Sequence, residues 1–282
     1  MQNFTTIAAL RAFQKSCKDK GETLALVPTM GALHDGHLSL VKLAQQKADH
    51  VIVSIFVNPM QFAPHEDFDA YPRVEDADAA KLAPLGIAGI FTPSVSEMYP
   101  EGFACNLSIT SALTNCLCGA ARPSHFDGVA IIVSKLLLQS RADVAVFGEK
   151  DWQQLQVIRR VNADLNIDCE IIGAPICRDE ASGLALSSRN AYLSDVERTA
   201  AGQLNVILAA FAADIRSGRD IDAAQNEAKD KISAAGFGQI DYLECRTAQS
   251  LERVTTFKPK QACRVFVAAK MGSARLIDNM AV

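Results

Sequence analysis

Strand-like and helix-like hydrophobic patterns alternate from residue 24 to residue 172, and no other feature of the chain restricts the fold as strongly. His50–Val57 is a nearly continuous apolar run, which is typical of a strand buried on both faces of a sheet. Strands that alternate with helices in this way predict an α/β fold with a Rossmann-like, doubly wound parallel sheet. The expected strands are 24–27, 50–57, 86–91, 143–147 and 168–172, and the expected helices are one that opens near residue 37, 73–85 (with Val74, Ala77 and Leu82 on its apolar face), 128–139 and 151–165.

The composition changes near residue 176, where the polar loop Cys177–Asn190 begins. Ser194 and Glu197 then have the spacing of a capping box, which opens a helix. We therefore predict a first domain of residues 1–176 and a smaller C-terminal α+β domain of residues 177–282. The first helix of this second domain is expected to bury an apolar face that comprises Val196, Ala200, Leu204, Ile207, Leu208, Phe211 and Ile215. A helix at 221–235 and strands at 240–246, 264–269 and 275–278 are expected to follow.

The bulk composition excludes several classes of protein. A net charge of −4 over 282 residues argues against a wholesale nucleic-acid binder, which needs a basic surface. No apolar run approaches the length of a membrane span, and the first twenty residues predict an amphipathic helix with Ile7, Leu10 and Phe13 inward instead of a cleavable signal. The cysteines are scattered and complete no zinc framework, so we expect reduced thiols and a cytoplasmic protein.

The stretch Leu24–Val41 predicts a strand, a tight turn and a helix, with His34 and His37 where the helix should begin. Backbone N–H groups at a helix N-terminus favour anions, and imidazoles beside them add donors. Gly31 and Gly36 would let the backbone approach a ligand closely. These features indicate a phosphate-binding turn, although two surface histidines in a loop are the simpler interpretation of either residue alone.

Three other segments carry polar groups where ligands would bind. In a doubly wound sheet, ligands bind beyond the carboxyl ends of the strands. Lys150 opens a helix there and could hold a phosphate, and Gln154 lies one turn further along that helix. Gln61 follows another strand, and its side-chain amide suits hydroxyl and carboxylate groups. Solvated surface side chains remain the alternative for all three. The loop group that could surround a pyrophosphate, or simply cap turns in a hinge, is Ser187, Ser188 and Arg189.

The segment His34-x-Gly36-His37 resembles the histidine–glycine–histidine signature of nucleotidyltransferases and class I aminoacyl-tRNA synthetases. Further motifs narrow this likeness to one family. From about residue 4 to residue 279 the chain resembles the pantothenate synthetases, the pantoate–β-alanine ligase family. The motifs that carry the likeness occur in the family's order and read VPTMGALHDGH, FVNPMQF, DFDAYPR, LCGAARPSHFDGV, VFGEKDWQQ, LSSRN and RLIDN.

The resemblance implies a two-step, ATP-dependent amide synthesis through pantoyl adenylate, with Mg²⁺, in a cytoplasmic homodimer. It places ATP and pantoate on the domain of residues 1–176 and makes residues 177–282 a lid or dimer-associated domain. It makes His37 the catalytic proton donor, and the need for donors at the phosphates adds His34 and Lys150. Gln61 would bind pantoate and β-alanine, and Gln154 would bind pantoate. The implied ATP-binding residues are Met30, Gly31, Ala32, Leu33, His34, Asp35, Gly36, His37, Gly148, Glu149, Lys150, Asp151, Cys177, Leu186, Ser187, Ser188 and Arg189.

The chain departs from the family pattern at three places. Leu186 stands where methionine is usual, Ser124 replaces a glycine and would be strained if φ is positive there, and the loop 178–186 is one residue longer. We expect the 177–190 loop to be a loose lid that closes over ATP, with Leu186 as its apolar anchor. A different nucleotidyltransferase, or a non-catalytic nucleotide sensor or tRNA-binding fragment, remains open from the residues alone. The sequence assigns no residue to Mg²⁺ or to the β-alanine amine.

Overall fold

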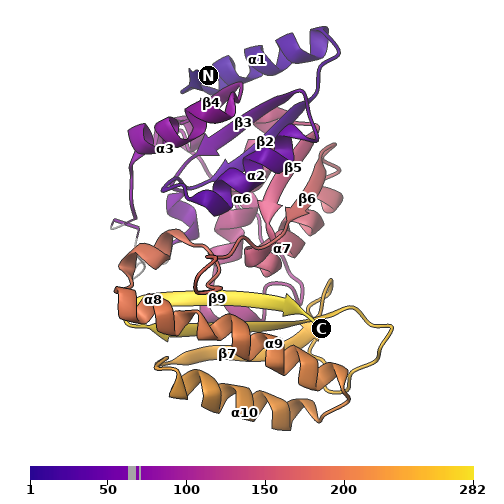
Figure 1. The fold of residues 1–282 in the computed structure, drawn as a ribbon. Coiled ribbons are helices and arrows are strands. Elements are labelled where there is room, and N and C mark those ends of the chain that lie inside the picture. Colours follow the sequence, from indigo (N-terminus) through magenta and orange to yellow (C-terminus); the bar gives the residue numbers. More distant parts are fainter. Residues whose placement is uncertain (63–67, 70) are drawn as a thin grey trace. The chain divides into compact units, whose positions relative to one another are not determined.

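The computed structural model describes residues 1–62, 68–69 and 71–282, which form two compact units (Figure 1). The first holds a six-stranded sheet and the second a three-stranded sheet. The main division falls between residues 175 and 176, beside the boundary expected from composition, but two earlier segments also join the second unit. The first unit comprises 1–110, 122–149 and 157–175, and the second comprises 111–121, 150–156 and 176–282.

The six strands of the first unit are all parallel, which confirms the predicted doubly wound sheet. The strand order is β1-β4-β3-β2-β5-β6. The chain starts at one edge with β1, crosses to β2 near the middle, adds β3 and β4 towards that edge, and then reverses direction to add β5 and β6 on the other side of β2. Between consecutive parallel strands the chain needs a crossover, which the helices supply. The strands are β1 (Gln2–Phe4), β2 (Leu24–Thr29), β3 (His50–Ile55), β4 (Gly89–Phe91), β5 (Val144–Gly148) and β6 (Glu170–Ala174).

Helices flank this sheet, and α6 is the longest of them at 16 residues. No helix in the described part of the chain combines the length and apolar character that a membrane span requires. One further helix, α7 (Trp152–Asp164), starts in the second unit and ends in the first. The helices of the first unit are α1 (Ile7–Asp19), α2 (Asp35–Gln45), α3 (Glu75–Leu82), α4 (Val95–Met98) and α6 (His125–Ser140).

Strand β2 is buried on both faces, as its apolar sequence predicts. Ala25 and Val27 belong to one buried cluster with Leu40 and Val41 of α2. Successive side chains of a strand point to opposite faces, so Leu26, which is fully buried, faces the other side. There α6 contacts β2 and α1. Helix α1 buries Leu10 as expected and leaves Ile7 and Phe13 half-buried.

Two features of the first unit differ from the sequence-based expectation. The short edge strand β1 was not predicted, because three residues are too few to show a period; it pairs with β4. The apolar face proposed for residues 73–85 was wrong. Val74 and Ala77 are exposed, and α3 instead buries Leu82 together with a carboxylate, Asp78.

The second unit is a smaller α+β layer, as predicted. Its antiparallel sheet has the order β7-β8-β9, and α9 and α10 pack side by side on it (Figure 1). Apolar side chains of these helices and strands form one buried cluster. The elements are α5 (Leu117–Ala121), α8 (Asp195–Ala201), α9 (Gln203–Arg216), α10 (Ile221–Ala234), β7 (Ile240–Thr247), β8 (Cys263–Met271) and β9 (Ala274–Ala281).

The helix expected after Ser194 is divided into α8 and α9. The capping box of Ser194 and Glu197 forms as predicted. Gly202 separates the two helices and packs so closely on the preceding loop that an added Cβ would lie 2.3 Å from the Ser182 carbonyl oxygen. Val196 was wrongly placed on the buried face: it is 81% exposed, whereas Leu204, Leu208 and Phe211 are buried in the core.

A glycine contact in the first unit sets the position of Gln61. Helix α6 crosses the short 3-10 helix η1 (Pro59–Gln61) at Gly128. A Cβ on Gly128 would lie 2.1 Å from the Met60 carbonyl oxygen, closer than non-bonded atoms can approach. The Asn58 side chain donates to the Gly128 carbonyl oxygen at 3.0 Å. This close approach therefore requires a residue without a side chain.

We expect Gly128→Ala to lower the stability of the protein by about 1–3 kcal/mol, the usual cost of overpacking, because η1 must move away from α6. Thermal unfolding measures this change. Gly238→Ala is the matched control, since the nearest atom to its added Cβ is 3.8 Å away. Equal melting temperatures for the two variants would contradict the steric account.

Candidate functional site

The predicted ligand-binding residues of the first unit lie at the point where the sheet reverses its winding. Strand β2 pairs with β3 on one side and with β5 on the other. Doubly wound sheets bind ligands in the crevice at the carboxyl ends of such strands. The turn Met30–His37 follows β2, the segment Asn58–Gln61 follows β3, and Gly148 and Glu149 close β5. The topology thus brings three predicted segments to one edge of the sheet.

The two histidines of the turn cap helix α2. His34 is the N-cap residue, and its Nδ1 accepts the Gly36 backbone N–H at 3.1 Å. His37, three residues on, uses its Nδ1 to accept the His34 backbone N–H at 3.3 Å. This is the geometry of a capping box with imidazoles in place of the usual hydroxyl and carboxylate. The ring centroids are 4.1 Å apart.

This capping arrangement fixes which nitrogen of each ring carries a proton. A neutral imidazole has one donor and one acceptor nitrogen, so a ring that accepts at Nδ1 carries its proton on Nε2. His34 and His37 therefore present Nε2–H groups as donors beside the positive end of α2. The sequence predicted histidine donors here, but the role of Nδ1 as a helix cap was not foreseen. The arrangement suits the binding of an anion such as a phosphate.

Gln61 lies next to the turn, and both its backbone carbonyl group and its side chain have partners. Its carbonyl oxygen accepts from His125 Nδ1 at 2.8 Å, and its side-chain amide Nε2 contacts Met30 Sδ. Arg122 approaches His125 Nε2 at 3.1 Å. Ser124, between them, has φ +66°, so the residue that replaces the family's glycine does occupy the left-handed region. His125 and Arg122 are functional candidates that residue-by-residue reasoning missed, although the motif LCGAARPSHFDGV contains both.

Asn58 fixes the position of the same segment through hydrogen bonds of its side chain. Its side-chain oxygen caps η1 by accepting the Met60 N–H, and it also accepts the Tyr99 hydroxyl at 2.7 Å. Burial raises the pKa of Tyr99, so the phenol keeps its proton and remains a donor across the neutral range. The Asn58 amide group in turn contacts Gln61 Oε1 at 3.3 Å. The Gln61 side chain is thus oriented before any ligand arrives.

The segment after β5 passes from the first unit into the second at Lys150. Asn279 Nδ2 of β9 donates to the Lys150 carbonyl oxygen at 2.9 Å, and the Trp152 indole N–H donates to the Ala248 carbonyl oxygen at 2.6 Å. Gln153 is buried and bonds three backbone groups of residues 113–118. These bonds explain why 111–121 and 150–156 belong to the second unit. The predicted site residues that lie in the second unit are Lys150, Asp151, Gln154, Cys177, Leu186, Ser187, Ser188 and Arg189.

The 177–190 loop is held by more contacts than its polar sequence suggested. Arg178 forms a two-pronged ion pair with Asp278 of β9, at 2.6 and 2.9 Å, and the Asp278 side chain is only 3% exposed. Leu184 packs into the core of the second unit, whereas Leu186 is only half-buried. The apolar anchor is therefore Leu184, and the expectation that Leu186 has this role was wrong. These contacts attach the first half of the loop to the second unit, and its closure over ATP stays a prediction.

Ser187, Ser188 and Arg189, the predicted pyrophosphate-binding residues, lie together at the start of one short helical turn. Ser187 is the N-cap of the 3-10 helix η4 (Ser188–Tyr192), and its hydroxyl accepts the Arg189 N–H at 3.3 Å. The buried Asn190 donates from its side chain to the Ala185 carbonyl oxygen. One hydroxyl thus caps a turn, as the simpler interpretation held, and Arg189 lies at the start of that turn. The motif Asp67–Arg73 cannot be placed fully, because Asp67 and Ala70 lie outside the described residues.

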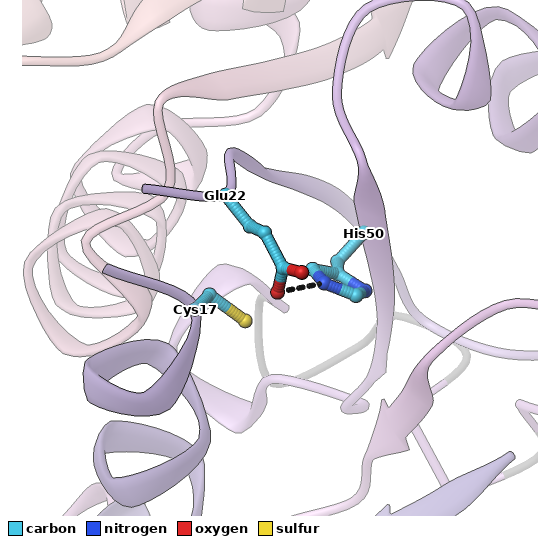
Figure 2. Close-up of side chains that lie close together, drawn as sticks. All are labelled: Cys17, Glu22 and His50. Atoms are coloured by element: carbon cyan, nitrogen blue, oxygen red, sulfur yellow. Dashed lines mark hydrogen bonds and ion pairs between the residues drawn. The ribbon is translucent and has the colours of Figure 1, made fainter. Parts of the chain in front are cut away.

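In the described residues, one group of three potential metal-ligand side chains converges at the amino ends of the strands, opposite the carboxyl ends where the histidine turn lies. Cys17, Glu22 and His50 lie before or at the amino ends of β2 and β3, with His50 Nε2 2.8 Å from Glu22 Oε2 (Figure 2). Burial raises the pKa of the Cys17 thiol, and the nearby Glu22 carboxylate adds to this, so the thiol stays protonated. Mg²⁺ prefers oxygen ligands, and a thiol with an imidazole does not fit it. The group is a histidine–glutamate hydrogen bond beside a buried thiol.

Comparison with known proteins supports a single family. The family model for pantoate-beta-alanine ligase matches residues 2–281. A pantothenate synthetase of Caulobacter vibrioides is 56% identical over 278 residues, covering 98% of this chain and 97% of that protein. The crystal structure of pantothenate synthetase from Thermus thermophilus superposes with a TM-score of 0.91 at 41% identity, covering 99% of each chain.

A second solved structure comes from Francisella tularensis and is a pantoate-beta-alanine ligase complexed with beta-gamma ATP and β-alanine. It superposes with a TM-score of 0.84 at 34% identity, covering 100% of this chain and 97% of that chain. The family model, the relatives and the fold agree over essentially the whole length. The chain therefore belongs to the pantoate–β-alanine ligase family, the enzymes that join pantoate to β-alanine.

Proposed function

We propose that the chain makes pantothenate from pantoate and β-alanine in two steps at the expense of ATP. In the first step a pantoate carboxylate oxygen attacks the α-phosphorus of ATP, the bond from that phosphorus to the bridging oxygen breaks, and pyrophosphate leaves. In the second step the β-alanine amine attacks the acyl carbon of pantoyl adenylate and AMP leaves. The amide nitrogen loses a proton as it forms. A carboxylate is a poor acylating agent, and adenylation gives it a good leaving group.

The observation that carries this proposal is the pair of histidine caps beside Gln61. Adenylation develops negative charge on phosphate oxygens, and donors that are already oriented stabilise such charge most. The Nε2–H groups of His34 and His37 are oriented because each Nδ1 is engaged by a backbone amide. We assign His37 as the proton donor, with His34 and Lys150 as further groups that stabilise charge at the phosphates.

Substrate selection is assigned to amide side chains. Gln61 would bind pantoate and approach β-alanine, and Gln154 would bind pantoate, because an amide offers both donors and an acceptor to hydroxyl and carboxylate groups. The complex of the Francisella relative with ATP and β-alanine supports both substrates. We place ATP and pantoate chiefly on the first unit and retain the ATP-binding assignment for Met30, Gly31, Ala32, Leu33, His34, Asp35, Gly36, His37, Gly148, Glu149, Lys150, Asp151, Cys177, Leu186, Ser187, Ser188 and Arg189.

Mg²⁺ is proposed to arrive with the nucleotide. Proteins usually hold this ion through one or two carboxylates together with substrate phosphates. In the described residues the one convergent group of three ligand side chains contains a thiol and an imidazole and does not suit it. Bound to the phosphates, the ion would neutralise their charge. The chain's own donors remain the imidazoles, Lys150 and Arg189.

We also propose that the chain works as a cytoplasmic homodimer, with the second unit associated with the dimer. The dimer rests on the family resemblance. The compartment is supported by the cysteines, all eight of which are described with free thiols. Burial raises the pKa of Cys169 and of Cys245 to about 12, which keeps these thiols protonated and unreactive. Such buried, reduced thiols are usual in a reducing compartment.

The two-step reaction predicts an isotope-exchange result. Purified protein should exchange labelled pyrophosphate into ATP when pantoate is present and β-alanine is absent, because adenylation is reversible on its own. Addition of β-alanine should then release AMP in a one-to-one ratio with pantothenate. Exchange of equal rate without pantoate, or formation of ADP, would refute the proposed reaction.

The capping role of His37 allows catalysis and helix stability to be separated. Glutamine at the third helical position can make the same bond to the N-cap N–H, so His37→Gln should keep the cap while removing the imidazole. We expect the adenylation rate to fall about 10²–10³-fold at saturating ATP with little change in melting temperature. His37→Ala should lose both the rate and some stability. Near-normal single-turnover adenylation by His37→Gln would remove this imidazole from the mechanism.

Gln61 is expected to act on pantoate and not on ATP. Gln61→Ala should raise the KM for pantoate by at least about tenfold, the effect of losing a hydrogen bond to a charged group, and leave the KM for ATP nearly unchanged. Gln249→Ala, at an exposed position of the second unit, is the control. If the ATP and pantoate constants rise equally, Gln61 belongs to a different part of the site.

A further inference from the structure

The nucleotide-binding turn rests on a buried carboxylate from a helix that the proposed mechanism does not use. Asp78 of α3 is fully buried. Its Oδ2 accepts the Ala32 backbone N–H at 2.8 Å and its Oδ1 accepts the Leu33 backbone N–H at 2.7 Å. Both oxygens are thus engaged by consecutive amides, 46 and 45 residues away in sequence. A buried charge is stable only when it is bonded in this way.

The same helix holds the turn by a second charged side chain. The Lys81 ammonium group donates to the Leu33 carbonyl oxygen. Asp78 and Lys81 are three residues apart on α3, a spacing that puts both on one face of the helix. A carboxylate and an ammonium group therefore bind the N–H and C=O groups of the same turn residue. We refer to these two side chains as the α3 clamp.

The turn needs such support because its backbone is unfavourable. Gly31 has φ +83° and Ala32 has φ +51°, in the left-handed region. For a residue with a side chain this conformation is unfavourable, so Ala32 does not adopt it without compensation. The Ala32 N–H to Asp78 bond is a charge-assisted hydrogen bond, which is strong enough to offset that cost.

The clamp also explains why residue 31 is glycine. A Cβ on Gly31 would lie 3.0 Å from Asp78 Oδ2 and 3.1 Å from Ile55 Cγ2. The carboxylate therefore fits against a backbone that carries no side chain. Thr29 completes the support, since its hydroxyl accepts the Gly31 N–H at 3.2 Å. Every backbone amide from Gly31 to Leu33 is thus engaged before His34 begins the helix.

We propose that Asp78 and Lys81 are positioning residues that hold the left-handed turn and so aim the His34 and His37 donors at the phosphates. The inference rests on the proposed function, because it takes the turn as the ATP site. Neither side chain needs to touch the substrate. The clamp acts through residues 31–33, whose conformation decides where helix α2 starts and which way its first amides and imidazoles point.

The decisive variant is Asp78→Asn. Asparagine has the same size, but its NH₂ group would face one of the two backbone N–H groups, so one bond is replaced by a donor–donor contact. We expect the KM for ATP in pantoate-dependent pyrophosphate exchange to rise at least about tenfold, with the KM for pantoate changed less than about twofold. Amide hydrogen exchange at residues 32 and 33 should accelerate. Asp76→Asn is the matched control, because Asp76 is an exposed carboxylate on the same helix.

Lys81→Met provides a second test if Asp78→Asn does not fold. It keeps an unbranched side chain and removes one bond to the turn, so a smaller rise in the KM for ATP, in the same direction, is expected. A folded Asp78→Asn or Lys81→Met enzyme with wild-type KM for ATP would overturn the clamp. So would a parallel loss for both substrates, which indicates general damage. Absence of pantoate-dependent exchange in the wild-type protein would instead refute the proposed function.

Discussion

The pairing of β2 with β5 is the constraint on which the rest of the first unit depends. Strand β2 leads to β3 and β4 on one side, and only after a long excursion does the chain return to lay β5 against its other edge. Parallel register then brings the ends of three strands to one edge. The histidine turn, the Gln61 segment and Gly148 meet there because of topology, although they are far apart in sequence.

Hydrophobic periodicity accounts for how much of this could be predicted from the sequence. The strands around residues 24–29, 50–55 and 144–148 have continuous apolar runs because both of their faces are covered, and such runs are visible without a structure. Their approximate positions fix the fold class. Strand β1 escaped notice because it is short, and Val196 was misplaced because an apolar residue at helical spacing can still face solvent. Periodicity records composition along a helix and not what packs against it.

The site was less predictable, because its geometry depends on polar contacts between distant segments. No motif or spacing in the sequence marks Asp78, and only the fold shows it bonded to residues 32 and 33. Arg178 looked like part of a polar hinge, yet it pairs with Asp278, 100 residues later. Gln153 is similar: its three backbone partners place the segment after β5 in the second unit. A single sequence gives no sign of such pairings.

The histidine caps show why the turn uses this residue type at both positions. Serine and glutamate would close a capping box equally well, as Ser194 and Glu197 do on α8. There, however, the serine hydroxyl donates to the glutamate, and the carboxylate has no proton to offer a ligand. An imidazole has two nitrogens on opposite sides of the ring. One can satisfy the orphan amides of the helix while the other keeps its proton for an anion. The bond that stabilises the helix is then also the bond that orients the donor, so the site is preorganised at no separate cost in side-chain entropy. Because the α3 clamp fixes the turn that carries these caps, the arrangement of the donors is determined by the folded backbone before any ligand binds.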